Sequence, residues 1–421
     1  MIFAGTVLLM LPFSTTGARA TWDEALFTAV SAVCVTGLVV QDTASFWSGF
    51  GQSVILILIQ VGGLGVVTVS AAFALLSGRK ITLMQRSTMQ EALSVPKVGG
   101  IVRLTGFILR TTILIELVGA AVMMPVFYRD YGPRGIWMSV FHSISAFCNA
   151  GFDLTGTPDA PYVSLTGYTG NALINIVVML LIVIGGIGFF TWEDVATKRF
   201  HLRRYRMQTK VILLSTAILI AVPSILFFLF EFQNLPVNER AFAAVFQSVT
   251  ARTAGYNTAD LRSMSEVGKL IMITLMMIGA SPGSTAGGIK TTTVAILVAN
   301  ALATFSSKEN VNLLGRRVDN GVVRSAATVL MMYTMLFMLG GLGISIIEGL
   351  PILTCMYETA SAVGTVGLTL GVTPTLCIAS RLILIMLMFW GRVGGLTLVF
   401  AALSGNRRTV SKLPLENITV G

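Results

Sequence analysis

Long apolar runs alternate with shorter polar connections along most of the chain. Four runs approach or exceed the length of about 20 residues that a helix needs to cross roughly 30 Å of hydrocarbon. They lie at residues 54–76, 173–190, 211–230 and 326–347. The pattern predicts several membrane-spanning helices and not a single anchor.

A shorter apolar run opens the chain. Residues 2–13 would cover about 18 Å at about 1.5 Å per residue, which is too short to cross alone. A signal-peptide core is disfavoured because no basic region precedes the run and Pro12 lies near its end. We interpret it as the end of a first span whose beginning precedes this sequence.

A short motif recurs four times between the apolar runs. Its copies read FTAVSAVCVTGL, FHSISAFCNAGF, FQSVTARTAGY and YETASAVGTVGL. Each opens with an aromatic residue, carries small Ser, Thr or Ala residues in its middle, and closes on a glycine followed by an apolar or aromatic residue. These closing glycines are Gly37, Gly151, Gly255 and Gly367.

A second marker follows each copy of the first. It reads VGGLG at 61–65, IGGIG at 184–188, AGGIK at 286–290 and VGGLT at 393–397. Because two markers recur in the same order, the sequence predicts four tandem units.

Each unit reads as a span, a short helix, a glycine-containing turn and a second span. The short helices are expected to begin near Trp22, Ile136, Val237 and Pro351 and to end at the glycine. They are too short to cross, so each must enter the membrane and turn back, with its irregular backbone hidden inside protein. The predicted units are residues 1–78 with a truncated first span, 79–200, 201–306 with a broken second span, and 307–404, followed by a tail at 405–421.

Composition and charge support this interpretation. The chain is 54% hydrophobic and 11% charged, with a mean hydropathy of +0.81. The net charge of +10 arises from basic clusters at 79–110, 198–210, 308–324 and 407–412. Basic connections of this kind lie on the cytoplasmic side of membrane proteins, so we attribute the charge to topology and not to nucleic-acid binding. The other connections are acidic, which either concentrates cations or is ordinary loop charge.

Enzymatic motifs are absent from the sequence. Four cysteines lack paired metal spacing, and no HExxH or GxSxG motif accompanies the two histidines. No GxGxxG follows a strand, so nucleotide control would have to come from another polypeptide. The sequence predicts that the chain is not an enzyme and holds no cofactor of its own.

The glycine turns suit the binding of a dehydrated cation. Backbone carbonyls provide oxygen ligands without fixed charge, and glycine adds no Cβ to block the path. The C-termini of the short helices would add a negative dipole end. The alternative is that each glycine only allows close packing of helices.

With these motifs, the chain resembles the Ktr/Trk/HKT superfamily of potassium transporters, most closely the membrane subunit of the bacterial Ktr system. The resemblance implies an all-α integral membrane protein of four membrane–pore–membrane units around a central pore, with eight spans and four re-entrant pore helices. It also implies a K⁺ selectivity filter in which only the fourth copy keeps a channel-like TVG. The implied filter residues are Val35, Thr36, Gly37, Asn149, Ala150, Gly151, Thr253, Ala254, Gly255, Thr365, Val366 and Gly367.

The third unit has an interruption in its second span, at GASPGSTAGG. Pro and Gly cannot continue a straight helix, whereas hydroxyls can satisfy freed backbone groups. The resemblance implies an intramembrane gating loop here, and the alternative is a simple kink. Lys290 is either a gate charge or a side chain that extends to the cytoplasmic face. The gate residues are Gly279, Pro282, Gly283, Ser284, Thr285, Gly287, Gly288 and Lys290.

Arg392 lies inside the last apolar run, where an arginine costs at least about 2.5 to 3.5 kcal/mol on insertion scales. Its context GRVGGLT is similar to the family pattern GRxGPLT, with Gly395 in place of the proline. The resemblance implies that Arg392 belongs to the gate as an electrostatic barrier beneath the filter. The alternative is a structural salt bridge.

Two further charged residues stand out. Glu116 lies within an apolar run and is expected to pair with a basic residue, with binding of a coupling ion as the alternative. Arg252 adjoins the third glycine turn, where it could support the loop through carbonyl contacts. A cation in the path would repel K⁺, so its side chain is expected to point away.

The expected function is K⁺ uptake across the cytoplasmic membrane, with Na⁺ as a candidate activator. The alternative is a secondary cation transporter coupled to Na⁺ or H⁺, a class that commonly shows inverted repeats. The resemblance implies a homodimer in the lipid membrane and a cytosolic KtrA-like ring that binds ATP or ADP. Basic loops and the C-terminus are expected in the cytoplasm.

Overall fold

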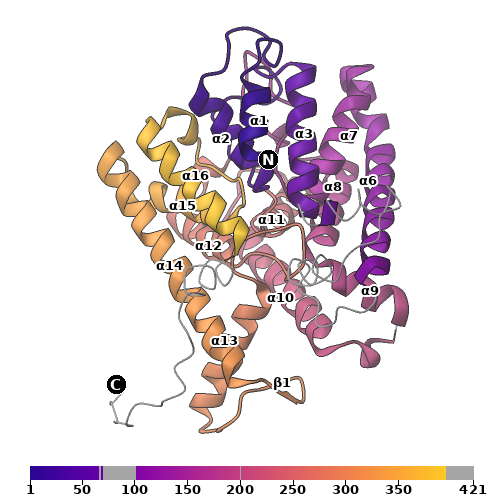
Figure 1. Ribbon diagram of the computed structural model, residues 1–421, viewed down its shortest axis with the longest axis vertical. Coiled ribbons are helices and arrows are strands. Elements are labelled where there is room, and N and C mark those ends of the chain that lie inside the picture. Colours follow the sequence, from indigo (N-terminus) through magenta and orange to yellow (C-terminus); the bar gives the residue numbers. More distant parts are fainter. Residues whose placement is uncertain (66–67, 70–100, 200, 395–421) are drawn as a thin grey trace.

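The computed structural model describes residues 1–65, 68–69, 101–199 and 201–394 of the chain. The predicted unit boundary at 78/79 and the predicted tail at 405–421 lie outside the described residues. Regular structure in the described residues is helical except for one two-stranded hairpin (Figure 1).

Among the described residues, three helices are long and apolar enough to cross a membrane. They are α6 (Ile101–Tyr131), α10 (Met207–Phe230) and α14 (Asn320–Glu348). Apolar side chains cover their outer faces: in α14, Met331, Leu339 and Ile346 are 64%, 66% and 82% exposed. Apolar faces of this extent require a lipid environment, so the chain is a multi-pass membrane protein.

Four short helices precede the glycine turns. They are α2 (Trp22–Val33), α7 (Arg134–Phe147), α11 (Val237–Thr250) and α15 (Ile352–Gly364). Their starts lie within two residues of the predicted positions. The prediction that they end at the glycine is wrong, because each stops several residues earlier where the next residues leave helical dihedral angles.

Each glycine turn leads into another helix. These helices are α3 (Gly49–Leu64), α8 (Ala172–Gly186), α12 (Glu266–Met277) and α16 (Ile378–Val393). The predicted apolar run at 173–190 is divided between two helices: α9 (Phe189–Lys198) follows α8 at an angle of 97°. The break occurs at Gly188, whose φ of +90° is not helical.

Gly188 has two counterparts that correct the register of the second marker. Gly65 and Gly394 also cap their helices, with φ of 85° and 87° against 90° at Gly188. By this geometry the fourth counterpart of VGGLG is WGRVG at 390–394, three residues before the predicted VGGLT. The reason is packing: a Cβ added to Gly62, Gly185 or Gly391 would lie 2.0 to 2.2 Å from a carbonyl oxygen just before a glycine turn, that of Val33, Phe147 or Val363.

The remaining elements lie at the edges of this arrangement. Helix α1 (Ile2–Leu9) packs on α2 and α3. Helix α13 (Thr291–Phe305) runs to the end of the molecule that carries the antiparallel hairpin of β1 (Asn312–Leu313) and β2 (Arg316–Arg317) (Figure 1). Short 3₁₀ turns complete the connections, at Thr166–Tyr168, Leu202–Arg204, Leu261–Ser263 and Thr373–Thr375.

Local sequence explains how the first short helix is fixed. Thr21 and Glu24 form a capping box, in which the Thr21 N–H donates to the Glu24 carboxylate at 2.9 Å. Asp23 in the same turn pairs with Arg381 of α16 at 2.8 Å. The beginning and the end of the described chain are therefore joined on one side of the molecule.

Candidate functional site

The four glycine turns share one backbone conformation. We call residues 35–37, 149–151, 253–255 and 365–367 the four glycine loops. The first residue of each is left-handed, with φ of 57°, 59°, 71° and 51°, and each closing glycine also has a positive φ, of 90°, 68°, 82° and 93°. A non-glycine residue rarely adopts this conformation, so its recurrence at Val35, Asn149, Thr253 and Thr365 is specific.

The four glycine loops form a closed ring. A Cβ added to Gly37 would lie 2.3 Å from the carbonyl oxygen of Ala150, and one added to Gly151 would lie 2.7 Å from that of Ala254. The same holds around the circle for Gly255 with Val366 at 2.5 Å and for Gly367 with Thr36 at 2.2 Å. All twelve predicted filter residues therefore come together, and no side chain fits at any of the four glycines.

Hydroxyl groups on the short helices hold the ring, and the sequence analysis did not assign them. The Gly37 and Gly367 N–H groups donate to Ser31 Oγ at 3.1 Å and Ser361 Oγ at 3.0 Å. In the other two loops the hydroxyl donates instead, Ser145 to the Phe152 carbonyl at 2.9 Å and Thr250 to the Tyr256 carbonyl at 2.6 Å. The sequence did contain a signal for these four hydroxyl residues, since each is the fifth residue of its copy of the repeated motif.

Residues 278–290, the gate loop, separate α12 from α13. The two ends of the gate loop lie side by side, because Ile278 and Ile289 form a parallel β-bridge. This geometry contradicts the alternative of a simple kink. A Cβ on Gly287 would lie 2.2 Å from Thr365 Oγ1, so the loop lies directly against the fourth glycine loop.

The gate loop also contacts the second glycine loop and the bend between α8 and α9. The Thr285 hydroxyl lies 3.3 Å from the side-chain amide of Asn149. The Ser281 N–H donates to the Gly186 carbonyl at 3.1 Å, and the Phe189 N–H donates to the Gly283 carbonyl at 2.8 Å. The bend therefore supplies backbone partners that an interrupted helix lacks.

Two predicted gate cations bind carbonyl oxygens. Lys290 Nζ folds back and donates to the carbonyls of Ala286 at 2.8 Å and Gly287 at 3.1 Å, so it does not extend outward. The half-buried Arg392 guanidinium donates to the carbonyls of Thr285, Gly62 and Gly63, the last at 3.2 Å. These contacts are to carbonyl oxygens and not to a carboxylate, so they disfavour the alternative salt bridge.

Glu116 and Arg252 each make a contact that differs from the expected one. Glu116 is buried, and one carboxylate oxygen accepts from Gln60 Nε2 at 3.2 Å, so the expected basic partner is replaced by an amide. Arg252 donates to the hydroxyl of Thr216 on α10 at 3.2 Å. Its side chain points to that helix, as expected, but its contact is a hydroxyl and not a loop carbonyl.

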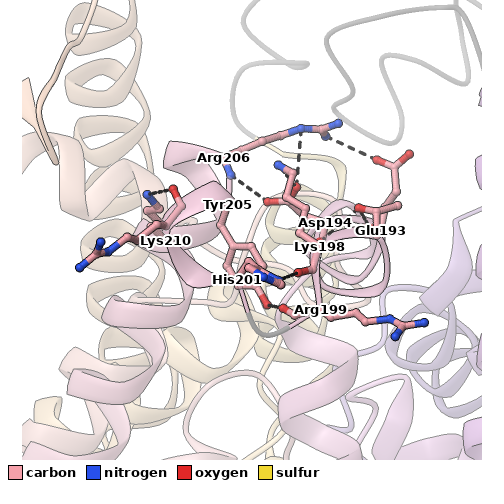
Figure 2. A network of polar contacts seen from close by, with 10 residues as sticks. Glu193, Asp194, Lys198, Arg199, His201, Tyr205, Arg206 and Lys210 are labelled. Carbon is pink, nitrogen blue, oxygen red and sulfur yellow. Dashed lines mark hydrogen bonds and ion pairs between the residues drawn. The ribbon is translucent and has the colours of Figure 1, made fainter.

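A polar network joins α9 to the connection that follows it (Figure 2). Asp194, whose side chain is 1% exposed, pairs with Lys198 at 2.6 Å and accepts from the backbone N–H of Arg206 at 2.8 Å. The Arg206 guanidinium also lies 4.0 Å above the ring of Phe190. The basic connection after α9 is thereby fastened to α9, whose first residue, Phe189, donates to the gate loop.

The ring of four glycine loops has the chemistry to bind a monovalent cation. The ring offers neutral carbonyl oxygens, whereas within the described residues no cluster of three or more His, Cys, Asp or Glu side chains could hold a metal ion. Carbonyl dipoles can replace the hydration shell of a passing monovalent cation. The guanidinium of Arg392 lies close by, bonded to carbonyl oxygens of the gate loop and of α3.

Comparison with known proteins points the same way. The family model described as TrkH, cation transport protein, matches residues 2–407. The potassium/sodium uptake protein NtpJ of Enterococcus hirae is 38% identical over 434 residues, covering 100% of this chain and 94% of that protein. Ktr system potassium uptake protein B of Bacillus subtilis is 40% identical over 407 residues, covering 95% and 90%.

A solved structure shares the fold. The potassium transporter TrkH from Vibrio parahaemolyticus matches with a TM-score of 0.74 at 18% identity, covering 95% of this chain and 83% of that one.

Proposed function

The chain belongs to the TrkH family of cation transport proteins, and we propose that it takes up K⁺ across the cytoplasmic membrane through the ring of four glycine loops. The observation that carries this proposal is the ring itself: each glycine meets the carbonyl of the next loop, and the last loop meets the first. Carbonyls arranged around one axis can bind a dehydrated K⁺. The names of NtpJ and of Ktr protein B associate such chains with potassium uptake.

The gate loop and Arg392 control passage in this proposal. The loop rests against Thr365 and Asn149, the first residues of two glycine loops, and Arg392 ties its Thr285 carbonyl to Gly62 and Gly63 of α3. The pathway opens when the loop moves away from the ring. A positive guanidinium at this place limits cation leakage while the loop is in position.

The four loops belong to four membrane–pore–membrane units, with eight spans and four re-entrant helices. The shared left-handed residue, positive-φ glycine and supporting hydroxyl argue for units of common design. The basic connections and the C-terminus face the cytoplasm, in line with the positive-inside rule. Na⁺ acts as an activator of uptake.

The membrane subunit works as a homodimer with a cytosolic nucleotide-binding ring. Two curated relatives are named as proteins of Ktr systems, from Bacillus subtilis and Vibrio alginolyticus, the latter 34% identical. The basic connection held by Asp194 is a suitable docking segment, because it is fastened to α9 and so to the gate loop. ATP and ADP would bind to the ring and not to this chain.

Replacing the four glycines one at a time by alanine tests the proposal. Each new Cβ would lie 2.2 to 2.7 Å from a carbonyl oxygen, so the ring must distort. We expect each variant to lower the apparent K⁺ affinity at least tenfold, which corresponds to about 1.4 kcal/mol. The measurement is ⁸⁶Rb⁺ and ²²Na⁺ uptake into proteoliposomes, with and without Na⁺.

The matched control is Gly17→Ala, because an added Cβ at Gly17 has no neighbour within 4 Å. This variant should transport like the wild type. Unchanged K⁺ affinity in all four ring variants would overturn the proposed filter. Uptake that requires Na⁺ to travel with K⁺ in fixed ratio would favour a coupled secondary transporter.

A further inference from the structure

An apolar cavity of about 490 Å³ lies between α10 and α13, away from the ring. Its walls include Leu214 and Ile218 of α10 and Val298 and Leu302 of α13. These four side chains are 50% to 61% exposed, so the cavity opens sideways along the helix pair. Water would be a poor occupant of such walls, because they offer few polar partners.

The cavity is longer than one membrane leaflet is thick. It extends along α13 from Thr291, at the gate loop, past the last turn of the helix to Lys308 and Asn312. The 15 residues of α13 rise about 22 Å, and one leaflet of hydrocarbon is about 15 Å thick. An acyl chain therefore fits along the helix, with room for a head group beyond its end.

The end of the cavity farther from the gate loop is polar and basic. Lys308, Asn310 and Asn312 line it. Arg316 and Arg317 pair with Leu313 and Asn312 in the hairpin, so two more basic residues lie on the strand next to the one that lines the cavity. The acidic Glu309 lies between Lys308 and Asn310 in the chain but does not line the cavity. The charge suits an anionic head group.

We propose that this cavity binds one acyl chain of an anionic phospholipid, with the head group held at Lys308 and the basic hairpin. Apolar walls, a length sufficient for an acyl chain and a basic mouth occur together here. A zwitterionic lipid would fill the same walls but gain less at the mouth, since each basic residue near an anionic lipid contributes about 1 kcal/mol.

The bound chain would also reach the gate. Thr291 lines the inner end of the cavity, and its N–H donates to the Ala280 carbonyl of the gate loop at 3.1 Å. Its hydroxyl lies 3.4 Å from that of Ser281. An acyl chain packed against α13 therefore restrains the helix whose first residue is bonded to the gate loop.

Lipid retention by the purified full-length protein tests the site. The protein is exchanged into nanodiscs of phosphatidylcholine with phosphatidylglycerol, extracted, and examined by native mass spectrometry. We expect Ala299→Trp, which fills the cavity, to lose the retained phosphatidylglycerol. The control Ala301→Trp lies on the same helix at an exposed position outside the cavity and should keep it.

The head-group contact has its own variants. Lys308→Gln should weaken phosphatidylglycerol retention about fivefold, and Lys308→Arg should restore it. Equal retention by the Ala299→Trp protein and the wild type would overturn the site, and equal retention of phosphatidylcholine and phosphatidylglycerol would overturn the anionic head group.

A transport measurement then separates this inference from the proposed function. In proteoliposomes, added phosphatidylglycerol should change the K⁺ uptake rate of the wild type and of Ala301→Trp but not of Ala299→Trp. A protein that binds the lipid but transports no K⁺ would leave the lipid site intact and refute the proposed function alone. An identical lipid response in Ala299→Trp and Ala301→Trp would refute the link to the gate.

Discussion

The guanidinium of Arg392 connects its own helix to two other parts of the chain. It lies on α16 and donates to Gly62 and Gly63 at the end of α3 and to Thr285 in the gate loop. The sequence predicted a charge that repels cations. The contacts add a second role, since a planar fork with several donors can tether carbonyls that a point charge cannot hold together.

Substitution of Arg392 by lysine and by glutamine separates the two roles. The tether predicts that both variants raise the basal K⁺ leak, because each loses at least one charge-assisted hydrogen bond worth about 1.5 to 3 kcal/mol. That loss corresponds to roughly tenfold or more in the ratio of closed to open protein. The measurement is K⁺ efflux from loaded proteoliposomes. A lysine variant as tight as the wild type would show that charge alone suffices.

The residues of the ring were predictable, whereas their supports were not. Gly37, Gly151, Gly255 and Gly367 recur with a small set of neighbours, so the repeat alone locates them. The hydroxyls of Ser31 and Ser361 recur equally well, but a small residue in a short helix is usually explained by packing. Their partners, two N–H groups six residues away, become visible only in the folded loop.

At the scale of elements, the bend between α8 and α9 matters most. The run at 173–190 is apolar apart from Asn175, and hydropathy alone cannot distinguish a straight span from one turned by 97° at Gly188. The same glycine conformation ends α3 and α16, at Gly65 and Gly394. The sequence did show the second marker in all four units. In the last unit, however, the letters VGGLT resemble VGGLG and place the marker three residues after the position that the packing indicates.

The network around Asp194 should determine how firmly α9 is held. Asp194→Asn removes one charge from a nearly buried pair with Lys198 and weakens the contact to Arg206, so we expect a loss of about 1 to 3 kcal/mol in local stability. Thermal unfolding in detergent should shift downward, and basal K⁺ leak should rise because Phe189 supports the gate loop.

Glu193→Gln is the matched control for that change. Glu193 is 37% exposed and lies 3.4 Å from the Arg206 guanidinium. An exposed pair of this kind contributes about 0 to 1 kcal/mol. If both variants shifted unfolding and leak equally, the buried carboxylate would have no special role.

At the scale of the whole molecule, the Asp23–Arg381 pair connects the first short helix to the last described helix. Burial alone would raise the pKa of Asp23, but hydrogen bonds from Thr21 and Arg381 lower it overall from its ordinary 3.8. The carboxylate therefore stabilises the fold at neutral pH. This contribution is lost as the pH falls below about 4 toward the lowered pKa of the folded protein.

Arg381→Gln should lower the free energy of unfolding by about 1 to 2 kcal/mol at neutral pH, between the values for exposed and buried pairs. The difference from the wild type should shrink on acidification to pH 3. Thermal unfolding at several pH values measures it. Arg129→Gln is the control, because Arg129 is 74% exposed in its pair with Asp130. A pH-independent difference would contradict the ion pair.

The number of spans was harder to predict than the central ring. Three described helices are long and apolar enough to cross, and a fourth results only if α8 and α9 count as one span. Helices α3 and α13 are apolar but shorter, so their depth depends on partners that hydropathy does not register. The four loops, by contrast, are specified locally by glycine, hydroxyl and aromatic positions.

The closed ring has a consequence for how the protein is made. Gly37 and its last neighbour, Gly367, are 330 residues apart in the chain. At about 5 to 20 residues per second, the first loop emerges from the ribosome about 15 to 65 seconds before its final neighbour exists. During synthesis the first glycine loop must therefore keep its conformation without its last neighbour. The local contact that holds it is the hydrogen bond from the Gly37 N–H to the Ser31 hydroxyl.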